Sequence, residues 1–100
     1  MSDWLRPWRV EIREAGRCGA IAYHEPAGSL SFFWELGGSD SVALVWGESA
    51  DHWHACHPWA ADRRRDILKR VAEEVVRQKA PNCRADIQEP QGLIHIRELD

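Results

Sequence analysis

The chain has 100 residues, of which 44% are hydrophobic and 29% are charged, and its formal net charge is −3. This length predicts one domain, residues 1–100, that buries enough surface to fold without staples, and the acidic balance argues against a nucleic-acid partner. No run approaches the roughly 20 apolar residues of a membrane span, and the first ten residues lack a signal-peptide pattern, so we expect a cytoplasmic protein without a membrane partner.

The first half of the chain predicts a β-meander. Residues 8–14 (WRVEIRE) alternate strictly between apolar and charged side chains, which is typical of a half-buried strand. Three further strands are expected at residues 20–25, 29–36 and 41–47, the last two joined by a turn at 37–40. Residues 41–47 (SVALVWG) are apolar on both sides, which indicates a central strand. Short connections between the four strands imply antiparallel pairing.

The second half changes period at about residue 59. Apolar residues then recur at helical spacing, which predicts a helix over residues 59–80 that ends before Pro81. Residues 83–88 and 93–99 flank a turn and predict a C-terminal hairpin. The whole order predicts a two-layer α+β domain, with the helix packed on one face of an antiparallel sheet. The strand order is left open.

A cluster of chemical side chains occupies residues 49–58 (SADHWHACHP). It contains His52, His54, Cys56 and His57, and histidine and cysteine are the preferred ligands of zinc. One hypothesis is therefore a zinc site made by these four residues. A helix would point the pair His52 and Cys56 away from the other two, and Pro58 pushes the preceding residue toward extended backbone. No single conformation of this segment gathers all four side chains.

Two other interpretations of the same segment stay open. Cys56 with His52 or His57 could form a thiol–imidazole pair, which would make the protein a cysteine-dependent enzyme. The favoured interpretation is structural: Ser49 caps a short helical turn, and Trp53 anchors it to the core. Its Cys56, like Cys18 and Cys83, is then expected to be a reduced thiol, because the three cysteines are odd in number and widely spaced.

Charge is distributed unevenly along the chain. Residues 18–61 hold five acids and no lysine or arginine, whereas residues 62–84 hold eight bases and four acids. We expect the two segments to pack together and partly neutralise each other; the alternative is an acidic and a basic surface. Arg64 lies in the middle of the apolar stripe, so we expect its stem on the core and its guanidinium on an acid such as Glu35 or Asp62.

The function predicted from these features is a non-catalytic protein-interaction module, such as an inhibitor, an immunity-type protein or an adaptor. It rests on the segmental charge, on six tryptophans and on the scarcity of catalytic motifs. Trp34 and Trp46 are expected in the core. The residues expected to bind a protein partner are Trp53, Trp59, Arg63, Arg64 and Arg65. The zinc-binding protein is the alternative, with zinc as its only cofactor, and the cysteine-dependent enzyme comes third.

Overall fold

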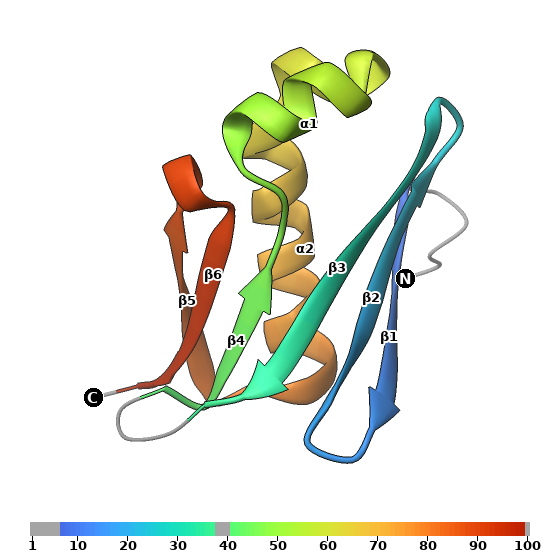
Figure 1. Cartoon of the computed structure of the whole chain (residues 1–100). Helices are drawn as coiled ribbons and strands as arrows, with labels where there is room; N and C mark the ends of the chain where they lie inside the picture. Colours follow the sequence, from blue (N-terminus) through green and yellow to red (C-terminus); the bar gives the residue numbers. More distant parts are fainter. Residues whose placement is uncertain (1–6, 38–40, 100) are drawn as a thin grey trace.

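The computed structural model describes residues 7–37 and 41–99 and shows an α+β domain with one six-stranded antiparallel sheet (Figure 1). The spatial order of the strands is β1-β2-β3-β4-β6-β5. Their bounds are β1 Arg9–Ala15, β2 Cys18–Glu25, β3 Gly28–Leu36, β4 Ala43–Trp46, β5 Cys83–Gln88 and β6 Leu93–Glu98. The predicted fold class, meander and C-terminal hairpin are thus confirmed, while part of the predicted turn at 37–40 lies outside the described residues.

The helical region has three parts where the sequence predicts one helix and a capped turn. Helix α1 spans Ala50–Cys56, a 3-10 helix (η2) spans Pro58–Arg63, and α2 spans Arg64–Lys79. Pro58 occupies the first turn of η2, where its missing N–H costs no hydrogen bond. A second 3-10 turn, η3, spans Glu89–Gln91. Among the described residues no helix is long and apolar enough to cross a membrane.

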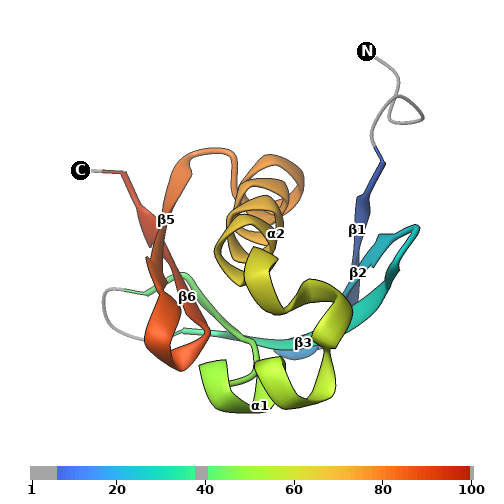
Figure 2. The same cartoon turned by 90° about the horizontal axis from the view of Figure 1, so that it is seen from above.

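The sheet curls around α2, which lies along its concave face (Figure 2). The apolar stripe of α2 faces the sheet, and its members Ile67, Leu68 and Val71 are fully buried. They pack with buried side chains of the strands, including Tyr23, Ile94 and Ile96. Alternate residues of each strand point to this concave face, and the others point to the opposite, convex face. In the described part of the chain no helix lies over the convex face (Figure 2).

The C-terminal hairpin fixes the position of β4. Strand β6 pairs with β4, with Val45 opposite Ile94, and β5 is the outer strand of the hairpin. Strand β4 is therefore central, as its apolar residues predict. The prediction that Trp46 is a core residue is wrong: its side chain is 41% exposed. Val45 takes the concave side of the four-residue strand, and its neighbour Trp46 consequently points to the convex side.

The side chain of Trp34 passes over strand β2 at Gly19, which has no side chain. Trp34 on β3 lies opposite Gly19 on β2, and its indole Nε1–H donates to the carbonyl oxygen of Arg13 on β1 at 2.9 Å. A Cβ atom on Gly19 would overlap that carbonyl and lie 2.7 Å from Trp34 Nε1. Glycine is required here for a close approach between the indole and the neighbouring backbone.

We predict that Gly19→Ala destabilises the protein by about 1–3 kcal/mol, because the added methyl group displaces the indole or the strand. Urea unfolding measures the change. Ser31→Ala, at an exposed position of the same sheet, serves as control and should stay within about 0.5 kcal/mol of the wild type. Equal stabilities of the two variants would contradict the proposed close approach.

Candidate functional site

The histidine-rich segment forms a capped helix, as its favoured interpretation predicts. The Ser49 side chain accepts a hydrogen bond from the backbone N–H of His52 at 3.4 Å and caps α1. Trp53 is 1% exposed, and its Nε1–H donates to the carbonyl oxygen of Ala60 at 3.0 Å. Trp53 therefore ties α1 to η2 and reaches the core between the sheet and α2.

The four predicted zinc ligands are only partly brought together. His52 Nε2 lies 3.5 Å from Cys56 Sγ and 3.6 Å from Glu48 Oε2, and His57 Nε2 lies 2.9 Å from the same carboxylate oxygen. His54 is two positions from His52, roughly 200° around the helix, and is exposed. In residues 7–37 and 41–99 no group of three or more His, Cys, Asp or Glu side chains is arranged to hold a metal ion. Zinc binding stays a prediction without a preformed ligand set.

Cys56 and His52 do form a thiol–imidazole contact, but the geometry differs from that of an activated nucleophile. In such a site a third group holds the imidazole through the ring nitrogen that faces away from the nucleophile. Here Glu48 approaches Nε2 of His52, the same nitrogen that faces the Cys56 thiol. Both Cys56 and His52 are exposed. The carboxylate consequently competes with the thiol instead of orienting the base.

The three consecutive arginines have three different environments. Arg65 is largely exposed, with 83% of its side chain accessible, and pairs with Glu89 at 3.1 Å. Arg63 donates to both carboxylate oxygens of Glu25, at 3.0 and 2.7 Å. Arg64 is 8% exposed, and its Nη2 donates to the backbone carbonyl of Glu48 at 3.0 Å. Of three consecutive arginines, one is therefore exposed to solvent, one binds a residue of the sheet and one is buried.

The prediction that Arg64 pairs with an acid such as Glu35 or Asp62 is wrong. The guanidinium lies 5.7 Å from the Trp53 ring centre and bonds to a backbone oxygen, and its Nε has no hydrogen-bond partner among the described residues. Burial lowers the pKa of Arg64 from its usual value, and the charge of Glu89 partly offsets this effect. Arg64 thus connects the start of α2, through this hydrogen bond, to the segment that follows β4.

Glu25 lies close to two arginines from the second half of the sequence, Arg63 and Arg70. Its carboxylate, 8% exposed, accepts hydrogen bonds from Arg63 and from the Tyr23 hydroxyl, the latter at 2.7 Å, and Arg70 lies 3.8 Å away. Burial by itself raises the pKa of Glu25, but the hydrogen bonds from Arg63 and Tyr23 outweigh it, and the net pKa is lowered. The predicted neutralisation between the acidic and basic segments is visible in this group.

The predicted partner-binding residues therefore share no single exposed surface. Trp53 and Arg64 are buried, so neither side chain is available to a partner in this conformation. Trp59 is partly buried over the turn between β2 and β3, where an added Cβ on Gly28 would lie 2.5 Å from its ring. Arg63 is held by Glu25 and stacks on Trp59 at 5.8 Å. Arg65 alone of the five has a mainly exposed side chain.

A different surface, on the convex face, was not predicted. Phe33 and Trp46 lie opposite each other on β3 and β4 and are 47% and 41% exposed. The register continues this row to Ala20 on β2 and to Leu93 on β6. We call these four residues, Ala20, Phe33, Trp46 and Leu93, the convex apolar row, of which Leu93 is only 9% exposed. The row brings two large aromatic side chains together at the middle of a sheet face that no helix in residues 7–37 and 41–99 covers.

Polar residues surround the convex apolar row. Trp46 Nε1–H donates to Glu35 Oε1 at 3.2 Å, which fixes the indole beside the neighbouring strand. At one end of the row the register places Arg13 on β1. Beyond the other end, Asp86 pairs with Arg84 and with Arg97, both at 2.7 Å. The face thus has an apolar centre and a rim of mixed charge.

One signal for this surface is present in the sequence. Alternation in residues 29–36 already puts Phe33 on the face opposite Leu30 and Phe32, so an outward-facing phenylalanine is expected. The partner strand is apolar on both sides, and alternation therefore cannot say which of its residues face α2. Pairing of Phe33 with Trp46 depends on the register, which only the folded sheet reveals.

No family model, no curated protein and no solved structure matches this chain.

We predict that Arg64→Ala destabilises the protein by about 1.5–3 kcal/mol, the usual range for a hydrogen bond to a charged group, because the Glu48 carbonyl loses its donor. Arg65→Ala, one residue along, should change stability by less than about 0.5 kcal/mol, since its side chain is exposed. Thermal and urea unfolding of the pair measures the contrast. Similar losses in both variants would contradict the structural role of Arg64.

A second prediction concerns acid stability. The pKa of Glu25 is lower in the folded protein than in the unfolded chain, where it is about 4.3. The ionised carboxylate therefore stabilises the fold fully above about pH 4.3, and this contribution to the free energy of unfolding is lost as the pH falls from there toward the folded-state pKa. Glu25→Gln should be less stable at pH 7 and should show a flatter decline between about pH 5 and 3. Urea unfolding across this range measures both slopes; parallel curves for the two proteins would contradict the lowered pKa.

Proposed function

We propose that the protein is a non-catalytic protein-interaction module that binds its partner through the convex apolar row. The single observation that supports this proposal is the exposed pair Phe33 and Trp46, side by side on β3 and β4. Contiguous exposed apolar side chains rimmed by polar ones are typical of protein-binding surfaces. Tryptophan in particular is enriched among residues that dominate binding energy.

The composition of the face favours a folded protein as the partner. An apolar centre surrounded by mixed charges corresponds to the usual anatomy of a protein–protein interface. A nucleic-acid surface needs an excess of cations, whereas here Asp86 pairs with both Arg84 and Arg97, and Glu35 holds Trp46. The partner is therefore expected to present an apolar patch about as wide as two aromatic rings.

The rigidity of the row also supports binding. Its residues belong to four adjacent strands, so the hydrogen bonds between the strands fix their backbone positions before a partner binds. The hydrogen bond from Trp46 to Glu35 further restricts the indole. Preorganised side chains lose less entropy on association, which raises affinity without adding contacts.

The test uses a photo-crosslinking phenylalanine analogue at position 33 of the full chain, expressed in the cells that make the protein. We expect a discrete crosslinked partner, identified by mass spectrometry, and its loss when Trp46→Glu is added. The same analogue at position 65 tests the rival arginine surface, since Arg65 is the most exposed of the residues predicted from the sequence to bind.

Two results would contradict the proposal. One is a partner that crosslinks from position 65 and not from position 33; the other is a partner retained in full by Phe33→Glu and Trp46→Glu. Circular dichroism of both variants checks that they fold, which is expected because both side chains lie on the solvent side of the sheet. Sedimentation of the wild type separates a foreign partner from a second copy of the chain.

A further inference from the structure

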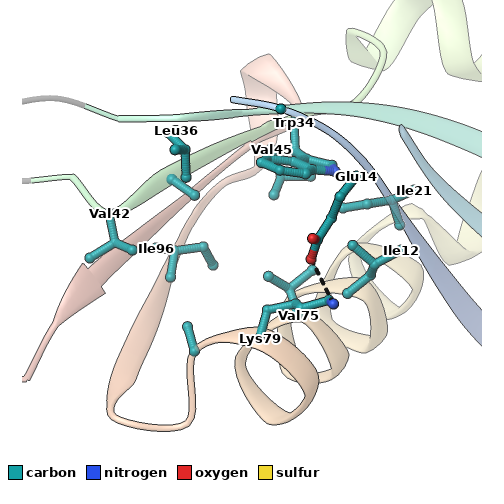
Figure 3. Close-up of a pocket in the computed structure, with 13 residues that line it drawn as sticks. Ile12, Glu14, Ile21, Trp34, Leu36, Val42, Val45, Val75, Lys79 and Ile96 are labelled. Carbon is teal, nitrogen blue, oxygen red and sulfur yellow. Dashed lines mark ion pairs between the residues drawn. The ribbon is translucent and has the colours of Figure 1, made fainter. Parts of the chain in front are cut away.

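A separate cavity lies on the concave side of the sheet, between the strands and the C-terminal end of α2. Its volume is about 260 Å³, and Figure 3 shows side chains of β1, β2, β3, β4, β6 and α2 around it. The C-terminal end of α2 is at the end of the molecule opposite α1 (Figure 1), and the cavity shares none of its lining residues with the convex apolar row.

The cavity exists because the apolar stripe of α2 ends before the sheet does. Val75 is the last buried residue of α2, Val76 is only partly buried, and the next positions of the stripe are Gln78 and Lys79. Gln78 turns aside and donates to the carbonyl oxygen of Val10 at 3.2 Å. Lys79 turns toward Glu14 on β1, 2.6 Å away. Neither side chain fills the space over the concave residues of β4 and β6.

The walls of the cavity are mainly hydrocarbon, and Glu14 and Lys79 are the charged residues that line it. Ile12, Ile21 and Ile96 line it together with Val42, Val45 and Val75. The small side chains of Ala43 and Ala80 leave room where larger ones would close it. Leu36, 43% exposed, stands at the open side, which gives a ligand a way in.

The polar groups at the wall already have partners. Trp34 Nε1–H is bonded to the Arg13 carbonyl at 2.9 Å, and Glu14 and Lys79 neutralise each other at the rim (Figure 3). The backbone N–H groups of Val42 and Ala80 donate to Ile96 and Val76, at 2.8 and 3.1 Å. A ligand would therefore find apolar contact along most of the wall, and the remaining hydrogen-bonding capacity of Glu14 and Lys79 lies on side chains that are 54% and 46% exposed.

We propose that this cavity binds a small neutral apolar molecule of about ten carbon atoms, on the scale of a fused bicyclic hydrocarbon. An apolar cavity of about 150 Å³ accommodates benzene, so a 260 Å³ cavity has room for a second ring. Ligand pockets are typically apolar, with only a few polar groups to fix orientation. This site follows that pattern, because isoleucine and valine side chains form most of its wall and favour a ligand that fits by shape and has few polar atoms.

The discriminating experiment compares indene with indole, which have nearly the same shape but differ by one N–H group. We expect indene to shift the methyl resonances of Ile12, Ile21 and Ile96 saturably in a carbon–proton correlation spectrum of the full chain. Indole should bind at least about fivefold more weakly, because its N–H group would lose its hydrogen bond to water when it is buried among the isoleucine and valine side chains. Equal affinity for the two compounds, or no methyl shift with indene, would overturn the proposal.

Cavity-filling variants locate the binding. Ala43→Leu fills the wall and Ala80→Leu fills the open end, and each should abolish the indene shifts. Ala20→Leu makes the same change on the convex face and should leave them intact. If Ala43→Leu fails to fold, Ala80→Leu is the variant that tests the proposal, and indene binding that persists in Ala80→Leu would overturn it. Methyl shifts that depend on protein concentration alone would also overturn the proposal, because they would indicate a second copy of the chain in the cavity.

Discussion

The carboxylate of Glu25 joins the two halves of this protein. It sits at the end of β2, receives the Tyr23 hydroxyl from its own strand, and holds Arg63 from the end of η2 through two hydrogen bonds. Arg70, about two helical turns further on, lies 3.8 Å from the same carboxylate and donates to the Tyr23 hydroxyl. Because these groups are mostly shielded from water, their pairing orients the start of α2 on the sheet more firmly than exposed ion pairs would.

Two neighbouring contacts complete this attachment at the same end of the molecule. Arg64 reaches the Glu48 carbonyl, and Trp53 reaches the Ala60 carbonyl, so the segment after β4 is bonded to the helices that follow it. The histidine-rich segment thus serves as a connector whose tryptophan, Trp53, is buried. The side chains that suggested chemistry in the sequence, His52 and Cys56, are left on its outside.

The helix is held firmly at its start, and its apolar stripe runs out before its end. The sheet consequently offers two apolar surfaces of different kinds. On the convex side, Phe33 and Trp46 form an exposed row suited to a large partner. On the concave side, the end of the buried stripe at Val75 leaves a partly open cavity suited to a small molecule. The two surfaces lie on opposite faces of β3 and β4, so occupation of one leaves the other sterically free.

The amino-acid sequence alone determined the strands, the helical stripe, the cap at Ser49 and the sheet-over-helix architecture, because these follow from local periodicity and backbone chemistry. Tertiary structure decided the partners of the polar side chains: Glu25 with Arg63 is a contact between residues 38 positions apart, and Arg64 found a backbone oxygen that no charge pattern indicates. It also decided which side of β4 faces the helix. A strand that is apolar on both sides has no alternation to reveal its orientation, so the exposure of Trp46 beside Phe33 was settled only by the pairing register and by the position of α2.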